Sequence, residues 1–328
     1  VIIMALLENI FGHDGGLKES SVGFAKTGQW IMFMEGPSGK CFNFSDCNEP
    51  VYPRLPLWYI SSYYNDSSVL YKEIQKIDEG CYAKSFDERR FLPLVQIFAD
   101  ASLLKGEIAP PLKKVWYGGE TVETHPTVLV HTNMADPKKD YFLALKGGRA
   151  STSHAHMDGG SFVYDAYGLR WAMDLGLQKY NGLEEYGIDL WNFGKESTRW
   201  SVFRLNNFSH NVITVNDNIY HFDGGSFLDK TFNTDRPGAL GGRYICYPLN
   251  LYTGTDNDLV SPALTRTAEL KPLVGAHPYE LEIKDELTAC AGKSPKIRWS
   301  MATPATAEII SDDCISLTQE GVILYLTS

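Results

Sequence analysis

A change in the spacing of apolar residues near residue 127 constrains the fold of this chain more than any other feature. Before that point, apolar residues recur at helical spacing, as Leu70, Ile74 and Ile77 do. After it, they alternate with a period of two, which is typical of β-strands. Because the predicted strands follow one another with few helices between them, we expect them to pair antiparallel in a β-sandwich. The predicted fold class is therefore α+β, with more than one domain.

The domain boundary is predicted from composition. Residues 106–126 are rich in proline, glycine and charge, which favours a linker between a helical domain at 1–105 and a β-sandwich domain at 127–328. Helices are predicted at residues 1–11, 22–34, 57–64, 68–77 and 90–104. Strands are predicted at residues 127–131, 141–146, 161–166, 169–175, 211–215, 279–283, 297–301 and 322–326. Apolar helices joined by short loops are typical of an α/α hairpin array.

The acidic composition restricts the partners of this chain. Its formal net charge of −10 argues against a nucleic-acid partner, because nucleic-acid binders usually present basic surfaces. An acidic sugar substrate stays compatible with that charge. Salt screens charges beyond about 8 Å, so a local group of basic side chains matters more than the total. The sequence does not specify an oligomeric state.

The cysteines and the ends of the chain carry few signals. The sequence has no C-x-x-C pair, so a cysteine metal site is not expected, and Cys41 and Cys47 are predicted to be thiols. The other cysteines are Cys81, Cys246, Cys290 and Cys314. The opening VIIMALLENIF has no basic stretch before it, so neither a signal peptide nor a spanning helix is predicted there. We expect the protein to continue beyond both ends, since each end falls inside a predicted element.

Residues 153–162 hold a cluster of groups that can bind a metal or transfer protons. If this segment is extended, His154 and His156 point to the same face. Such a pair can bind a divalent ion, or one imidazole can bind metal while the other transfers protons. Two histidines in a surface loop are an equally good interpretation of the spacing by itself.

Two later residues converge on the histidine pair. Tyr167-Gly168 is predicted to be a two-residue hairpin turn, and pairing outward from it places Asp174 opposite Ser161. A carboxylate in a buried strand needs a partner, which a cation can supply. His210 stands at the start of another predicted strand. Taken singly, Asp174 would be a turn carboxylate and His210 a core histidine. Together with His156 they predict a zinc site with an open position.

Several blocks of the sequence resemble heparinase II/III-like polysaccharide lyases. They are SHAHMDGGSFVYDAYGLRWAMDLG, LWNFGKESTRW and FSHNVITVND, with GPSGKCFNFSDC upstream and KIRWSMAT downstream. The finer similarity leans toward the exolytic branch that acts on oligo-alginate and heparin. The resemblance implies the end of an incomplete α/α toroid, then an antiparallel β-sheet domain, with an active site between them. It also implies a periplasmic or secreted bacterial protein. The catalytic tyrosine of the family, in a Tyr-Trp motif, would precede this chain.

The resemblance also implies roles for individual residues. His154 corresponds to a catalytic histidine, and the zinc ligands fall on His156, Asp174 and His210. The implied reaction is β-elimination on a uronic-acid glycan, either heparin or heparan sulfate or an alginate oligosaccharide, with zinc in a structural role. Tyr180 is a candidate second proton carrier, although a packing tyrosine is the plainer interpretation.

Three further residues are predicted to bind substrate. Arg199 could bind a carboxylate or sulfate and Trp200 could stack on a sugar. The alternative is a surface arginine over a core tryptophan. Asn43, with Asp46 nearby, could line the substrate cleft, or both could cap a helix.

Two other functions fit parts of the pattern. A metal-dependent hydrolase is one, because H-x-H-x-D resembles metallo-β-lactamase-like sites. Those sites need a histidine directly after the aspartate, where this chain has Gly159. A noncatalytic carbohydrate-binding β-sandwich is the other. It would explain the strands and aromatic residues but not Asp174 aligned with three histidines.

Overall fold

The chain folds into two compact units. The first comprises Val1–Glu35 with Pro50–Leu112, and the second comprises Gly36–Glu49 with Lys113–Ser328. The sequence predicted contiguous parts, whereas the structure packs residues 36–49 with the second unit. Cys290 lies outside the described residues. The computed structural model describes residues 1–85, 89–112, 114–229, 244–249, 259–273, 275, 278–289 and 294–328.

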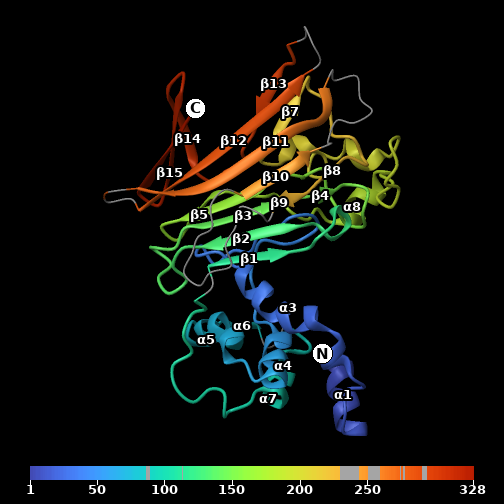
Figure 1. Ribbon diagram of the computed structural model, residues 1–328, viewed down its shortest axis with the longest axis vertical. Coiled ribbons are helices and arrows are strands. Elements are labelled where there is room, and N and C mark those ends of the chain that lie inside the picture. The colour runs from blue at the N-terminus through green and yellow to red at the C-terminus, as the bar shows by residue number, and fades with distance from the viewer. Residues whose placement is uncertain are drawn as a thin grey trace. The chain divides into compact units, whose positions relative to one another are not determined.

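The first unit is helical (Figure 1). Its helices are α1 (Ile2–Phe11), α2 (Leu17–Ser20), α3 (Val22–Phe33), α4 (Leu55–Tyr64), α5 (Tyr71–Asp78), α6 (Cys81–Ser85) and α7 (Val95–Phe98). The helices α3 to α7 contribute to a core that includes Leu57, Trp58 and Leu70. The helix predicted at 90–104 is shorter, because the Asp100 side chain accepts a hydrogen bond from the Ser102 backbone N–H and forms a turn instead. Within the described residues, no helix is long and apolar enough to cross a membrane.

The second unit is built mainly from antiparallel strands (Figure 1). The strands in its first half are β1 (Val115–Gly118), β2 (Thr127–His131), β3 (Phe142–Lys146), β4 (Gly148–Arg149), β5 (Phe162–Ala166), β6 (Leu169–Ala172) and β7 (Ile213–Val215). Those in its second half are β8 (Gly225–Ser226), β9 (Leu228–Asp229), β10 (Tyr244–Leu249), β11 (Leu259–Pro272), β12 (Tyr279–Ala289), β13 (Ile297–Trp299), β14 (Thr306–Ser311), β15 (Cys314–Gln319) and β16 (Val322–Thr327). Every predicted strand overlaps one of these.

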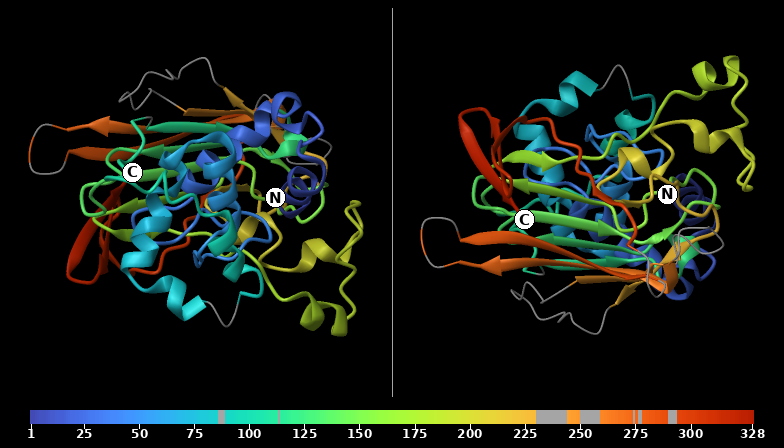
Figure 2. Two further views of the ribbon diagram at one scale, coloured as in Figure 1. Left: turned by 90° about the horizontal axis from the view of Figure 1, so that it is seen from below. Right: turned by 90° about the horizontal axis from the view of Figure 1, so that it is seen from above.

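Two sheets share the core of the second unit. One has the order β1-β2-β3-β5-β6 and the other has the order β12-β11-β10-β9. Figure 2 shows β11 and β12, in orange, lying beside the green strands of the first sheet. Val128 and Leu143 from the first sheet and Leu264 and Ala268 from the second belong to one buried cluster. Helices and antiparallel sheets therefore coexist, as the predicted class required.

The hairpin formed by β5 and β6 corrects one part of the predicted register. Its turn, Tyr167-Gly168, is as predicted, with positive φ at both residues. A bulge beyond Asp165 then shifts the pairing, so that Tyr164 lies opposite Ala172. The strand ends at Ala172, since the next residue donates its backbone N–H to Ala302 instead. The predicted pairing of Asp174 with Ser161 is therefore wrong.

Residues 36–49 are anchored to the five-stranded sheet by a buried arginine. Arg170 donates to the Asp165 carboxylate at 2.7 Å and to the backbone oxygens of Cys41 at 2.8 Å and Lys40 at 3.1 Å. The sulfur atoms of Cys41 and Cys47 lie 4.0 Å apart, against about 2.0 Å in a disulfide, so they are not bonded to each other. The anchored segment carries Asn43 and Asp46 to the site described below.

The far end of the same segment packs against Gly176. Asn43 donates its side-chain N–H to the Asp174 backbone oxygen at 3.1 Å, and Leu177 donates its backbone N–H to Cys47 at 3.1 Å. Gly176 has a φ of 57°, and a Cβ added there would lie 2.3 Å from the Cys47 oxygen. Glycine is therefore required both for the backbone conformation and for the close approach.

We expect Gly176→Ala to destabilise the protein by about 2 kcal/mol or more, because it adds a backbone clash to an unfavourable φ. Gly168→Ala is the matched control. Its φ of 76° is similarly positive, but the nearest atom to its added Cβ is 3.8 Å away, so it should cost only about 1 kcal/mol. Urea unfolding of both variants measures the difference. Equal losses would show that docking of the segment at Gly176 contributes nothing.

Candidate active site

His154 and His156 lie in the turn region after β4 and not in an extended segment. His154 has a φ of 61°, which is rare for a residue other than glycine and is often found at functional sites. The turn is held from outside: Arg199 donates to the Ala155 backbone oxygen at 2.7 Å, and Met157 donates its backbone N–H to Leu205 at 2.9 Å. His154 is exposed, whereas His156 is buried.

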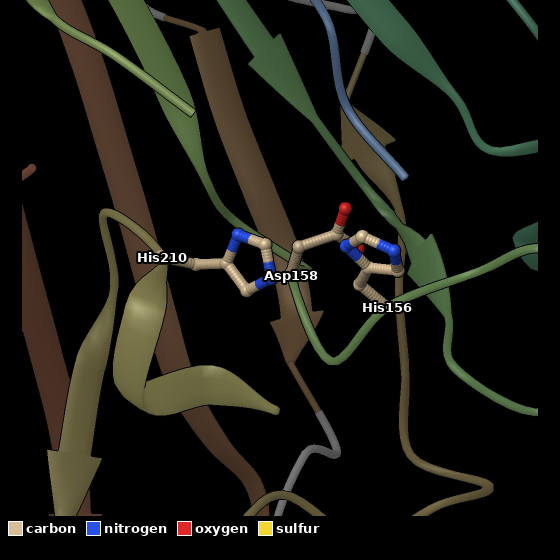
Figure 3. A group of neighbouring side chains, drawn as sticks. All are labelled: His156, Asp158 and His210. Carbon is tan, nitrogen blue, oxygen red and sulfur yellow. The ribbon is translucent and has the colours of Figure 1, made fainter. Parts of the chain in front are cut away.

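A buried group of three side chains could hold a metal ion. One potential ligand atom from each of His156, Asp158 and His210 lies within 4.8 Å of the other two. In the view of Figure 3, the Asp158 side chain lies between the two imidazole rings. The buried atoms His156 Nδ1 and His210 Nε2 have no hydrogen-bond partner among the residues that the structure describes. Two unpaired imidazole nitrogens beside a carboxylate fit a divalent ion such as zinc.

Asp174, a predicted ligand, contacts the other side of the His210 ring. Its Oδ2 lies 2.8 Å from His210 Nδ1, and its Oδ1 accepts the Gly176 backbone N–H at 2.7 Å. Asn211 fixes the neighbouring backbone by donating to the backbone oxygens of Phe162 at 2.7 Å and Met173 at 3.0 Å. In this arrangement, Asp174 orients the His210 ring so that Nε2 points away from it.

Asp158 is the member of the group that sequence reasoning missed, although it stands two residues after His156. It forms a fully buried ion pair with Lys146, and its other oxygen accepts the Ser45 backbone N–H at 3.3 Å. Burial opposes ionisation, but Lys146, His210 and His156 together outweigh it and lower the pKa of Asp158 to about 2. The carboxylate is therefore charged at neutral pH.

The pKa shifts of the two buried histidines differ in direction. Burial lowers the pKa of His156, so its imidazole is neutral and can act as a ligand. Burial also opposes protonation of His210, but the Asp174 carboxylate outweighs it and raises the pKa of His210. The raised pKa means that the nearby carboxylates stabilise a positive charge at this point of the interior. They would stabilise a divalent cation in the same way.

His154 and Tyr180 form a second pair beside the buried group. Tyr180 is the first residue of α8 (Tyr180–Glu185), and its hydroxyl lies 2.7 Å from His154 Nδ1. The two rings are stacked, with centroids 6.1 Å apart and planes 7° from parallel. Burial, and then a hydrogen bond to Asp46, raise the pKa of Tyr180, so its hydroxyl keeps its proton. Both residues were predicted from the sequence, and the structure places them in direct contact.

An exposed tryptophan completes this surface. Trp191 is 55% exposed, and its ring meets the rings of His154 and Tyr180 nearly edge-on, with centroids 5.8 and 5.5 Å away. Sequence reasoning missed it and selected Trp200 from the same block instead. A cavity of about 460 Å³ lies alongside, lined by Phe44, Ser45, Asp46, Cys47, His125, Ser153 and His154.

The three predicted substrate-binding residues are buried. Arg199 is 1% exposed and donates to the backbone oxygens of Leu190 and Ala155. Trp200 is 3% exposed, and Asn43 is 1% exposed and bonded to Asp174. Side chains that are buried to this extent present no surface to a sugar. In this structure, Arg199 holds the turn that contains His154, and Asn43 holds the segment that contains Asp46.

Comparison with solved structures finds heparinase III and a heparan sulfate lyase among the proteins to which this chain is similar. Heparinase III is 12% identical, with a TM-score of 0.34, over 93% of this chain and 54% of that one. The heparan sulfate lyase HepC from Pedobacter heparinus is 9% identical, with a TM-score of 0.36, over 92% of this chain and 52% of that one. This chain therefore spans about half the length of these solved structures. No curated protein sequence matches it significantly.

A family model gives the assignment. The model described as Heparinase II/III-like, C-terminal matches residues 130–324, more than half of the chain. The matched segment contains both histidines of the turn, the β5–β6 hairpin and His210. This chain belongs to the heparinase II/III-like family through its C-terminal domain.

Proposed function

We propose that this protein acts as a polysaccharide lyase that cleaves uronic-acid glycans by β-elimination. The observation that carries the proposal is the contact between two proton-carrying groups, His154 and Tyr180, at the edge of a cavity. His154 is accessible, because its side chain is 54% exposed. Tyr180 is protonated at neutral pH because its pKa is raised. A base and an acid side by side are what an elimination requires.

The reaction needs two proton transfers. The proton on C5 of a uronate is acidified by the adjacent carboxylate, and a base removes it. A C4–C5 double bond then forms as the C4–O4 bond breaks, and an acid returns a proton to O4. We assign the first transfer to His154 and the second to Tyr180. No water is consumed, which distinguishes the reaction from hydrolysis.

We further propose that a zinc ion occupies the group formed by His156, Asp158 and His210. The two unpaired imidazole nitrogens support this, as does the surplus of negative charge that raises the pKa of His210. Bound there, the ion would cross-link the turn that carries His154 to the segment that carries His210. Its proposed contribution is structural, because a rigid turn holds His154 in place.

We propose heparin or heparan sulfate as the substrate class, on the strength of the family, with alginate oligosaccharides as the alternative. The helices of the first unit are proposed to be the end of an α/α toroid. A periplasmic or secreted bacterial location is proposed on the same grounds.

The cavity lining includes His125, whose pKa is lowered to about 4 by burial. His125 is therefore neutral at pH 7 and adds no positive charge to the cavity.

Product analysis tests the proposed function. Because the solved relatives are about twice as long, the assay uses the full-length protein that contains this chain. It is incubated with heparan sulfate, heparin and alginate oligosaccharides, and the ultraviolet absorbance of the unsaturated uronide is followed. New reducing ends without that absorbance would indicate the metal-dependent hydrolase instead. Binding without any cleavage would indicate a noncatalytic carbohydrate-binding protein.

Trp191 is expected to stack on a sugar ring of the substrate. Trp191→Ala should raise KM about 3- to 10-fold and change kcat less, because an aromatic contact contributes about 0.5–1.5 kcal/mol. Tyr186→Ala is the matched control, since Tyr186 follows α8 directly and is 89% exposed. Initial rates over a range of heparan sulfate concentrations measure both. An unchanged KM in Trp191→Ala would rule out the stacking role.

A further inference from the structure

Asp46 makes more contacts with the site than its position in the sequence suggested. Its Oδ2 accepts the Tyr180 hydroxyl proton and lies 3.3 Å from His154 Nδ1, while its Oδ1 lies 3.2 Å from His156 Nε2. The Asp46 side chain is only 6% exposed. One carboxylate thus touches both candidate proton carriers and one candidate metal-binding histidine. Asp46 lies in a turn between Phe44 and Cys47 and caps no helix.

These contacts fix the direction of the hydrogen bonds around His154. A charged carboxylate can only accept, so the Tyr180 hydroxyl donates to Asp46. Because the Tyr180 hydroxyl proton is donated to Asp46, the Tyr180 oxygen has no proton left for His154 Nδ1, 2.7 Å away. In that contact the Tyr180 oxygen can only be the acceptor. His154 Nδ1 must therefore carry a proton. When the imidazole carries a single proton, its other nitrogen, Nε2, is then left with a lone pair.

The position of Asp46 is itself over-determined. Its segment is held to the sheet by Arg170 through the backbone oxygens of Lys40 and Cys41. On the other side, the Cys47 oxygen accepts a hydrogen bond from Leu177. A residue fixed from both sides can hold its partners to a single geometry, which a mobile surface carboxylate could not do.

We propose that Asp46 is a positioning residue that holds His154 in the tautomer with the proton on Nδ1, so that Nε2 is available as the base. Asp46 does this directly and through the Tyr180 hydroxyl. The proposal rests on the proposed lyase function for its catalytic consequence, but the tautomer itself is independent of any reaction. From the sequence, Asp46 was expected only to line the substrate cleft or to cap a helix, so a role in orienting His154 is new.

Nitrogen NMR on ¹⁵N-histidine-labelled protein tests the tautomer directly. We expect His154 to show a protonated Nδ1 in the wild-type protein, identified by the signals lost in His154→Asn. In Asp46→Ala, His154 should become a mixture of tautomers. Asp46→Asn retains the size of the side chain and serves if the alanine variant does not fold. Asp136→Asn is the matched control, because Asp136 is a turn carboxylate in the same unit whose contacts are with Lys138 and Lys139.

Kinetics on the full-length protein tests the consequence. Asp46→Asn should lower kcat by about 10- to 100-fold, the usual effect of losing an orienting partner, with KM changed less than about twofold. Asp136→Asn should match the wild type. A purely structural role would lower thermal stability without this separation of kcat from KM.

Each result decides the proposal. A His154 tautomer that is unchanged in both Asp46 variants would overturn it, whatever the activity. An altered tautomer with unchanged kcat would overturn it too, because the positioning would then have no catalytic effect. Loss of zinc from both variants would make Asp46 a ligand instead. If the wild-type protein forms no unsaturated product, the lyase function fails, and the NMR result still decides whether Asp46 sets the tautomer.

Discussion

Replacing His154 with asparagine is expected to lower turnover by about 10²- to 10⁴-fold, the usual range for a lost general acid or base. Asparagine is chosen because it tolerates the left-handed backbone at φ 61°, whereas alanine would add strain to the loss of the imidazole. Zinc content and melting temperature should stay close to those of the wild type. His154 lies outside the buried group, and its side chain is 54% exposed.

The measurement combines uronide formation, zinc content and thermal unfolding on the same preparations. His221→Gln is a suitable control, because His221 belongs to the same unit and contacts Phe222 and Asp223 rather than the site. If His154→Asn lost zinc as completely as a variant of His156, His154 would be a ligand. If it kept full activity on every substrate that the wild-type protein cleaves, the proposed proton transfer would be refuted.

The second large effect is expected from the metal group. The wild-type protein should bind about one zinc ion per chain. His156→Gln and His210→Gln should each lose nearly all of it and melt at a lower temperature, because the ion cross-links separate segments. A chelator should lower the melting temperature of the wild-type protein but not of these variants. Zinc analysis and thermal unfolding, with His221→Gln as control, measure both effects.

The extent of zinc loss shows whether Asp174 orients His210 or binds the ion directly. Asp174 contacts His210 Nδ1 and not the unpaired Nε2, so Asp174→Asn should weaken zinc binding by about 10- to 100-fold. If Asp174→Asn abolished zinc binding as fully as His210→Gln, Asp174 would be a direct ligand, as the sequence predicted. Unchanged zinc content in His156→Gln and His210→Gln together would eliminate the site.

Local pattern was enough to predict several parts of the structure. The strand at residues 127–131 and the turn at Tyr167-Gly168 follow from alternation and from the turn preference of glycine, both of which act within a few residues. β11 was missed, although it is the longest strand in the described part of the chain. Its alternating charged residues, as in TRTAELK, give no clear signal until β12 pairs with it.

The sequence by itself determined five of the chemical groups that this protein brings to its site. His154, His156, Asp174, Tyr180 and His210 were all selected from it, and the structure places each of them in or beside one cluster. Their types and order along the chain are local information. The segment that the family model matches contains all five of them.

Only the tertiary structure decided how those groups are connected. The bulge in the β5–β6 hairpin moved Asp174 out of its predicted pairing, and it now contacts the His210 ring. The anchoring of residues 36–49 by Arg170 brought in Asp46, 108 residues from His154 along the chain. Burial turned Arg199 inward to the backbone of the turn. Such contacts depend on the packing of distant segments against one another, and no spacing within a segment encodes them.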